Sequence, residues 1–398
     1  MKVIGIEEGR EKIKKINKKK LTVLIIISVL ILTSIILFCV YMGNKTFRDF
    51  MDKYVLMKNV TENNLNSITL EEPENIQVYA YDKYISVFSQ NKLVGYNSNG
   101  KKEYELSVEI TNPIIDTNNR FLLIAEKEKQ RIYLISGNNI VWQKDLEGNI
   151  SRINVNKNGY VSVIITGTTY KSIIQTFDSQ GNEMFKTYLS NSIAMDSDIS
   201  SDNKYMSFAE ISTNGTTVQS RIKTVSIQKA KEKEASSDPI ISNIASPTDS
   251  VALSIKYQDS NRLVCMYDDS IHILQNGADE ELLKLKEDGQ KVVFGDIKLN
   301  NFVVRILEKS VLLSTQSTVE FVNVGSKKTN IYTIDSVVKE IYVNNNYIAL
   351  NLGSEVYFVG TNGWLNKKYT SSQEVRKVVI NNECAGIVYR DKIEIINL

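Results

Sequence analysis

The sequence is poor in the residues that build many catalytic and metal sites. Its 398 residues include one histidine, His272, three cysteines, four prolines and two tryptophans. One imidazole and three scattered thiols exclude the usual His and Cys zinc sites. Any Ser–His or Cys–His relay would depend on His272. The low proline and glycine content excludes collagen-like and low-complexity chains, whereas 42% hydrophobic and 24% charged residues are typical of a folded protein.

An uncharged stretch of 22 residues lies near the N-terminus, from Leu21 to Met42. As a helix it would be about 33 Å long at ~1.5 Å per residue, enough to cross a hydrocarbon core of ~30 Å. The apolar part of a cleaved signal peptide is shorter, ~7–15 residues, and is followed by small residues. Here the stretch ends in bulky residues, and Phe38 before Cys39 argues against a lipoprotein signal. We therefore predict an uncleaved transmembrane helix over residues 21–42, with the lipid bilayer as its partner.

The charges on either side of this stretch predict its orientation. Residues 1–20 carry eight Lys and Arg against three Glu, a net charge of +5; because the whole chain is at +2 and the span is uncharged, residues 43–398 are at −3. The basic flank stays in the cytoplasm, so we expect a cytoplasmic tail over 1–20 and an extracytoplasmic C-terminal region. The lysines could also lie on anionic lipid, although setting the topology is the simpler role. The acidic outer region argues against nucleic-acid binding.

The segment after the span has apolar residues at helical spacing. Between residues 44 and 59 there is no Gly or Pro, and the spaced residues are Phe47, Phe50, Met51, Tyr54 and Val55. We expect a short amphipathic helix there, as a stalk or cap within a juxtamembrane segment over 43–65.

From residue 66 onward the apolar pattern has a period of two. Short runs rich in Ile, Val, Tyr and Phe alternate with clusters of Asn, Asp, Ser and Gly, which is typical of an all-β sandwich, barrel or propeller. One element recurs: an apolar run, a polar turn that ends in Gly, and a strand with a large ring. Its copies are Tyr96–Gly100 before Tyr104, Phe177–Gly181 before Phe185, and Val359–Gly363 before Trp364.

These repeats divide the outer region into eight units. They begin near Ile76, Asn112, Ile150, Ala194, Val251, Val292, Val338 and Val375. Residues 66–398 then give about 42 residues per unit, within the ~40–45 of a four-stranded propeller blade. We predict an eight-bladed β-propeller over 66–398. A seven-bladed ring, with about 48 residues per blade, stays open as an alternative.

Two irregular segments lead to further expectations. The last unit has room for three strands only, so we predict that Ser67–Leu70 supplies its fourth strand and closes the ring, which also removes exposed sheet edges. The longest unit contains a charged, Ser-rich insertion over residues 228–239, which we expect to be a loop.

The segment Ile135–Leu146, with its Ser-Gly-Asn-Asn turn before Trp142, resembles the repeat of quinoprotein-like (PQQ-like) β-propellers. The membrane-anchored layout is similar to that of envelope proteins of low-GC Gram-positive bacteria that are known only as domains of unknown function. Trp142 and Trp364 hold the aromatic position at the blade end, and Tyr104 and Phe185 replace Trp elsewhere. The resemblance implies a propeller over about 66–398. In that family the fold serves quinone-dependent dehydrogenases and also non-enzymatic scaffolds, and no matching active-site motif is found here.

We assign no catalytic, cofactor-binding or metal-binding residue from the sequence. His272 alternates with apolar neighbours and is expected to be a surface or cross-strand residue. Asp196, Asp198 and Asp202 are similar to oxygen-rich calcium loops, but they lack the spacing and the Gly of an EF-hand loop. The adjacent pair Asp268 and Asp269 is expected at a solvated turn, and Gly295 and Gly325 are isolated. Most Tyr rings are expected to pack between blades rather than to bind sugar.

The two cysteines of the outer region, Cys265 and Cys384, lie in apolar strand-like runs. They could pair only if the fold brings them together, and two buried free thiols are the expected state.

The leading functional hypothesis is a single-pass membrane protein that presents its propeller outside the cell as a non-enzymatic protein-binding or scaffold module. Its partner would be a protein of the cell envelope, and no cofactor is expected. The alternatives are a quinone-dependent dehydrogenase-like enzyme and a cell-wall glycan binder.

Overall fold

The computed structural model describes residues 18–61, 65–70, 76–212, 219–232, 238–247, 250–286, 289–311, 314–344 and 346–398. The predicted N-terminal tail therefore lies outside the described residues as far as residue 17. The chain forms two compact units, Met1–Asn59 and Val60–Leu398.

The N-terminal unit is helical. Helix α1 (Lys18–Gly43) contains the apolar stretch, and Leu21–Gly43 is a candidate membrane span by length and composition. Its apolar side chains are exposed along the whole stretch. Asn44 alone separates α1 from α2 (Lys45–Phe50), and its side-chain oxygen accepts a hydrogen bond from the N–H of Phe47 at 3.0 Å, which caps α2. A π-helical turn, η1 (Met51–Val55), follows directly, so a short helix forms where the spacing predicted one.

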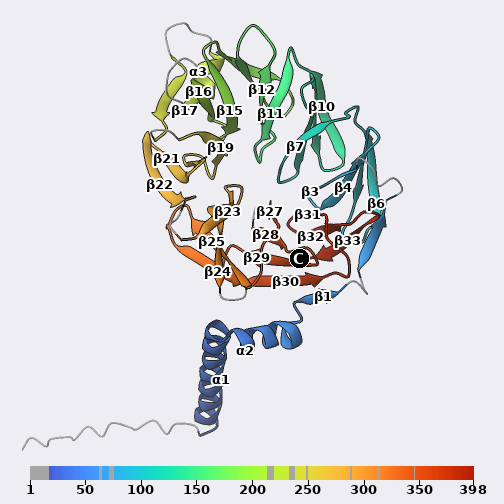
Figure 1. Ribbon diagram of the computed structural model, residues 1–398, viewed down its shortest axis with the longest axis vertical. Helices are drawn as coiled ribbons and strands as arrows, with labels where there is room; N and C mark the ends of the chain where they lie inside the picture. The colour runs from blue at the N-terminus through green and yellow to red at the C-terminus, as the bar shows by residue number, and fades with distance from the viewer. Residues whose placement is uncertain are drawn as a thin grey trace, which may run out of the picture. The chain divides into compact units, whose positions relative to one another are not determined.

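The second unit is a ring of eight antiparallel sheets around a central axis (Figure 1). Blade 1 contains β3 (Gln77–Tyr81), β4 (Tyr84–Ser89), β5 (Lys92–Tyr96) and β6 (Lys102–Ser107), and blade 2 contains β7 (Pro113–Asn118), β8 (Phe121–Glu126), β9 (Arg131–Ser136) and β10 (Asn139–Asp145). Blade 3 contains β11 (Asn149–Val155), β12 (Val161–Thr166), β13 (Ser172–Phe177) and β14 (Glu183–Leu189), and blade 4 contains β15 (Ser192–Ile199), β16 (Tyr205–Ser212), β17 (Ser220–Ser226) and β18 (Ile240–Ala245).

The remaining four blades follow the same order. Blade 5 contains β19 (Ala252–Tyr257), β20 (Leu263–Tyr267), β21 (Ser270–Gln275) and β22 (Ala278–Lys284), and blade 6 contains β23 (Lys291–Asp296), β24 (Phe302–Val311), β25 (Ser314–Asn323) and β26 (Thr329–Ile334). Blade 7 contains β27 (Glu340–Asn344), β28 (Tyr347–Asn351), β29 (Glu355–Gly360) and β30 (Leu365–Thr370), and blade 8 contains β31 (Lys377–Ile380), β32 (Cys384–Val388), β33 (Lys392–Asn397) and β2 (Asn66–Thr69).

The eight-bladed prediction is confirmed, and the seven-bladed alternative is wrong. Every blade begins within two residues of its predicted start: β11, for example, begins at Asn149 where Ile150 was expected, and β27 at Glu340 where Val338 was expected. The agreement arises because alternation and polar turns mark each blade independently.

The ring is closed by a strand from the other end of the chain. β2 lies antiparallel to β33 as the outermost strand of blade 8, with Ser67 opposite Glu394 and Thr69 opposite Lys392. This confirms the predicted closure. A further strand, β1 (Asn59–Thr61), lies beside β30 and makes blade 7 five-stranded, which the sequence did not indicate.

The charged insertion in blade 4 begins with a short helix rather than with a loop. Helix α3 (Ile227–Lys231) forms there because Ser226 caps it, accepting from the N–H of Lys229 at 3.5 Å, and because Ile227 is buried in the core. The expectation of a loop is therefore wrong for these residues. Residues 233–237 lie outside the described part of the chain.

Packing between neighbouring blades forms much of the core. Trp142 of blade 2 is buried against Phe177 of blade 3, with ring centroids 5.6 Å apart. Its ring also covers Gly181, whose φ is +83° and where an added Cβ would lie 2.8 Å from the indole Cγ. Trp364 holds the equivalent repeat position in blade 7 but is 39% exposed. The repeat aromatic therefore contributes to the core at Trp142 and to the surface at Trp364.

We predict that Gly181→Ala destabilises the propeller more than Gly277→Ala does. Both glycines have positive φ, but Gly277 (φ +79°) has open space around its Cα, whereas Gly181 lies against Trp142. An alanine at positive φ lowers the free energy of unfolding of both variants by about 1 kcal/mol. Overpacking against Trp142 lowers that of Gly181→Ala by a further amount of about 1–3 kcal/mol. Urea unfolding of the full chain in detergent, followed by tryptophan fluorescence, measures both changes. Equal midpoints for the two variants would contradict the packing of Trp142 on Gly181.

We also predict that Ile68→Ala weakens the ring closure. Ile68 is the buried residue of β2, so its truncation should cost about 2–5 kcal/mol. Ser67→Ala, on the exposed side of the same strand, is the matched control and should change stability by less than about 0.5 kcal/mol. Proteolysis of the full chain should show faster release of β2 in Ile68→Ala alone; identical cleavage rates would count against closure by β2.

Candidate functional site: the central channel and the faces of the ring

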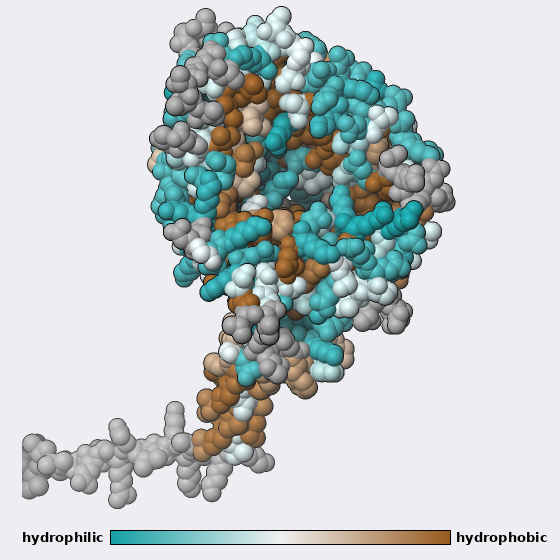
Figure 2. Space-filling model, in the orientation of Figure 1, coloured by the Kyte–Doolittle hydropathy of each residue, from teal (hydrophilic) through white to brown (hydrophobic). Residues whose placement is uncertain are grey.

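The innermost strands of the blades surround a cavity of about 530 Å³ on the ring axis. Figure 2 shows the hollow at the centre of the ring. A second cavity of about 340 Å³ shares Asn118, Lys256, Lys298 and other residues with it. The walls are polar because each innermost strand turns its non-core residues toward the axis.

Carboxylates of the innermost strands tie one blade to the next. Asp116 of β7 accepts a hydrogen bond from the N–H of Val155 in β11 at 2.9 Å. Asp196 of β15 accepts from the N–H of Ile255 in β19 at 2.9 Å. These innermost strands have no further strand on the axial side, so the carboxylates satisfy backbone donors that would otherwise face the cavity.

A buried ion pair joins blades 4 and 5. Asp198 accepts from the N–H of Tyr257 at 2.7 Å, and its other oxygen lies 3.6 Å from Lys256 Nζ. Burial raises the pKa of Asp198 to about 6, although Lys256 opposes this rise. Burial alone would lower the pKa of Lys256, but Asp198, Asp116 and Asp196 together raise it. The pair is therefore ionised at neutral pH at the expense of its desolvation.

A second lysine lies where the ends of the ring meet. Lys377 of β31 donates from Nζ to the carbonyl of Val78 in β3 at 2.9 Å, and its ammonium lies 5.0 Å from the ring centroid of Tyr79. Burial lowers the pKa of Lys377. Asn381 adds a side-chain hydrogen bond to the carbonyl of Tyr84 at 3.3 Å. Polar side chains thus connect blade 8 to blade 1 as well.

The three aspartates that the sequence analysis compared with calcium loops bind different partners. Asp196 and Asp198 bind β19, whereas Asp202 accepts from Ser200 Oγ at 2.8 Å and from the N–H of Lys204 at 3.2 Å within its own turn. Within the residues that the structure describes, no three His, Cys, Asp or Glu side chains form a group that could hold a metal ion.

His272 is a cross-strand residue, as expected, but it is buried at 6% exposure rather than at the surface. Its Nδ1 lies 2.7 Å from Asp279 Oδ1 and its Nε2 lies 3.1 Å from Ser270 Oγ, which is the spacing of a Ser–His–Asp relay. However, Ser270 Oγ also lies 2.8 Å from Asp269 Oδ1, and Ser270 is only 4% exposed. Because both Ser270 and His272 are buried, a substrate in solvent does not reach the hydroxyl, and the contacts of His272 connect β21 to β22.

The other residues considered from the sequence also have structural partners. Asp268 and Asp269 lie at the turn between β20 and β21, as expected, and Asp268 is exposed. Asp268 accepts from the N–H of Val251 at 2.9 Å and Asp269 accepts from Ser250 Oγ at 3.3 Å, so both carboxylates also hold the start of β19. Gly295 lies against Leu285. Gly325 lies against Arg262.

The cysteine expectation is confirmed: Cys265 and Cys384 are buried and free. Burial raises the pKa of Cys384 to about 11. Burial raises the pKa of Cys265 as well. Neither thiol is therefore a reactive nucleophile at neutral pH.

Several tyrosines pack between blades, as predicted. Tyr81 of blade 1 donates to the carbonyl of Gly137 in blade 2 at 2.7 Å. Tyr369 of blade 7 and Tyr389 of blade 8 share a buried hydrogen bond of 2.6 Å between their hydroxyl groups.

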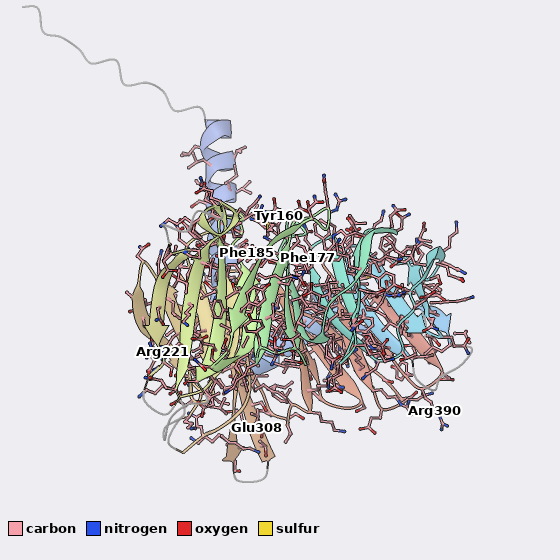
Figure 3. All side chains as sticks on the ribbon, turned by 90° about the horizontal axis from the view of Figure 1, so that it is seen from above. Tyr160, Phe177, Phe185, Arg221, Glu308 and Arg390 are labelled. Atoms are coloured by element: carbon pink, nitrogen blue, oxygen red, sulfur yellow. The ribbon has the colours of Figure 1, made fainter. Side chains whose placement is uncertain are left out.

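Exposed apolar residues lie on both faces of the ring. Turns between the second and third strands of a blade lie on one face with the connections between blades; we call it the connection face, and Figure 3 shows Arg221, Glu308 and Arg390 near it, with Tyr160, Phe177 and Phe185 toward the opposite face. Exposed apolar residues near the strand ends of the connection face are Tyr170, Tyr188, Ile193, Leu253, Val311 and Val337. Tyr170 and Tyr188 form a pair there, with ring centroids 4.8 Å apart.

A long hairpin extends the connection face. β24 and β25 have ten residues each, whereas the neighbouring β23 and β26 have six, and Figure 3 shows Glu308 on the part that projects beyond the ring. Sequence analysis did not identify this face, although the run over residues 302–323 without Gly or Pro was a usable signal of an extended hairpin.

Comparison with known proteins supports the fold. The profile of a family of unknown function, DUF5711, matches residues 57–398. Among solved structures, the C-terminal WD40 domain of Sif2 has a TM-score of 0.54 at 11% identity over 83% of this chain and 99% of that one. BamB from Moraxella catarrhalis has a TM-score of 0.48 at 11% identity, covering 84% and 97%, and apo AztD from Citrobacter koseri has 0.45 at 10%, covering 81% and 90%. No curated protein matches the chain.

We predict that Asp198→Asn flattens the dependence of stability on pH. The folded pKa of about 6 lies above the ordinary value of 3.8, so the folded state binds the proton more tightly and stability falls as pH rises from about 4 to about 6. A pKa that is raised by about 2 corresponds to a loss of about 3 kcal/mol in the free energy of unfolding over this pH range. Other carboxylates contribute with the opposite sign, so the test is the difference between the two chains. In urea unfolding at pH 4 and pH 7, Asp198→Asn should lose less stability, or gain more, than the unchanged chain does over the same rise in pH.

Asp202→Asn is the control of opposite sign. Burial would raise the pKa of Asp202, but hydrogen bonds from Ser200 and Lys204 lower it below its ordinary value. Its contribution to stability is therefore present at neutral pH and is lost as pH falls through the folded pKa. If both variants changed the pH dependence in the same direction, the buried state of Asp198 would be contradicted.

Proposed function

We propose, from the premise that the chain belongs to the family of unknown function DUF5711, that its propeller is a non-enzymatic protein-binding or scaffold module. The observation that carries the proposal is the connection face, where exposed apolar side chains and a projecting hairpin occur together on a rigid closed ring. Exposed aromatic and apolar groups on a rigid surface are typical anchors of protein interfaces.

The assignment of the polar residues supports binding rather than catalysis. Asp116, Asp196 and Asp198 accept hydrogen bonds from backbone donors of the next blade. Each is used to hold the ring together. A catalytic group would instead need a free proton or lone pair directed at a substrate.

The proposed setting is the membrane surface. In this proposal residues 21–42 span the bilayer once, residues 1–20 lie in the cytoplasm, residues 43–65 connect the two units, and residues 66–398 form an extracytoplasmic propeller of the PQQ-like type in a Gram-positive cell envelope. Helix α1 supports this because its exposed apolar side chains extend over 23 residues, from Leu21 to Gly43. The flanking charges support the orientation.

The test is crosslinking in native membranes with paired surface variants. Tyr188→Ser removes an aromatic ring that is 51% exposed on the connection face, and Ile331→Ser removes an apolar side chain that is 55% exposed beside Gly363 on the opposite face. We expect one discrete crosslinked protein with the unchanged chain, a loss of at least about tenfold with Tyr188→Ser, and retention with Ile331→Ser.

Three outcomes would count against this function. Equal loss with both variants would show that the contact is not on the connection face. Stoichiometric uptake of a quinone by the full chain would favour the dehydrogenase alternative. Retention of isolated cell wall by the full chain, with no crosslinked protein, would favour the glycan-binding alternative.

A further inference from the structure

Five large apolar side chains stand exposed immediately after the candidate span. They are Phe50 at 53% exposure, Tyr54 at 60%, Val55 at 55%, Leu56 at 50% and Met57 at 77%. We call residues 44–58 the elbow. Such a run of exposed apolar groups is costly in water, so it marks a surface that another medium or molecule covers.

The elbow is fixed against the last turns of α1 by a polar cluster. Tyr41 donates to Asp52 Oδ1 at 2.6 Å, and Lys58 Nζ lies 2.8 Å from the same carboxylate. Lys58 also donates to the Tyr41 hydroxyl at 3.0 Å, and Asp52 is only 5% exposed. Burial alone would lower the pKa of Lys58, but the hydrogen bonds to Asp52 and Tyr41 raise it, so Lys58 stays charged at neutral pH.

This cluster determines the depth of the elbow relative to the span. Tyr41 is two residues from the end of α1 at Gly43, so Asp52 and Lys58 lie level with the last turn of the helix. Where α1 crosses a bilayer, that turn lies at the boundary between headgroups and acyl chains. Tyrosine and lysine side chains are enriched at this level because their apolar parts and polar ends face different media.

The charge of the elbow suits the same boundary. Its lysines and arginine are Lys45, Arg48, Lys53 and Lys58, and its acids are Asp49 and Asp52, which gives a net charge of +2. Lys53 lies 4.9 Å from the ring centroid of Tyr54, so a cation accompanies the exposed ring. A cationic segment with exposed apolar rings is the composition of a helix that lies in an anionic membrane surface.

We propose that the elbow is a lipid-docking surface whose Phe50, Tyr54 and Leu56 side chains insert into the headgroup boundary of the leaflet on the C-terminal side of α1. The inference rests on the proposed membrane anchor and adds a second, shallow contact to it. A span alone leaves the chain free to rotate and tilt, whereas an inserted elbow fixes the direction in which the chain leaves the membrane.

The test places a tryptophan in the elbow of the full chain in vesicles of phosphatidylcholine and phosphatidylglycerol. Tyr54→Trp is the probe, and Leu30→Trp, at the middle of α1, reports the span. Asn99→Trp, in an exposed turn of the propeller, is the matched control, and fluorescence of the unchanged chain is subtracted. Lipids carry bromine either near the headgroup or near the methyl end of the acyl chain.

We expect Tyr54→Trp to be quenched at least about twofold more by bromine near the headgroup than by bromine near the methyl end, with the reverse order for Leu30→Trp and no lipid quenching for Asn99→Trp. Quenching of Leu30→Trp without quenching of Tyr54→Trp would overturn the docking surface and leave the anchor standing. Absence of quenching at both positions would overturn the anchor and the docking surface together. Protection of Tyr54→Trp from aqueous acrylamide without lipid quenching would show that protein covers the elbow, which also contradicts the inference.

Discussion

The pairing of β2 with β33 is the constraint on which the propeller depends. Four residues, Asn66–Thr69, supply the outer strand of a blade whose other three strands lie more than 300 residues later in the sequence. Without this strand, β33 would present an unpaired edge and the first and last blades would be joined by side chains alone. Strand pairing, burial of Ile68 and the contacts of Lys377 and Asn381 with blade 1 all act at this one junction.

Closure explains why several charged residues at the channel have structural partners. Eight innermost strands face a common axis, and each has one edge without a strand beside it. Carboxylates of β7 and β15 satisfy N–H groups of β11 and β19, and Lys256 compensates the charge that accumulates among them. If the hydrogen-bond and ion-pair partners of these carboxylates were ignored, the polar wall would resemble an acidic binding site. The carboxylates are instead explained by the backbone N–H groups at the free edges of the innermost strands, which need hydrogen-bond acceptors.

Patterns local to one blade and the closure of the ring could be predicted from the sequence, whereas the specific polar partners between blades could not. Alternation and polar turns are repeated within about forty residues, so they placed all eight blade starts within two residues. The pairing of Asp198 with Lys256 depends on the register of two separate sheets, about which a single strand carries no information. The contact between His272 and Asp279 lay within reach, because the Asn276-Gly277 turn predicts a hairpin that brings β21 and β22 together.

Residues packed between blades and residues on the faces of the ring are under different constraints, and this difference indicates where a partner can bind. Residues between blades are constrained by their neighbours: Trp142 fits Gly181, and Tyr369 bonds to Tyr389. Turns and hairpin ends carry no such constraint, so β24 and β25 can lengthen without disturbing the ring. Variation is therefore tolerated at the ends of the strands and resisted between the sheets. A surface evolved on this scaffold would be expected at a face of the ring, where exposed Tyr170 and Tyr188 lie, rather than in the channel that the ring needs for its own closure.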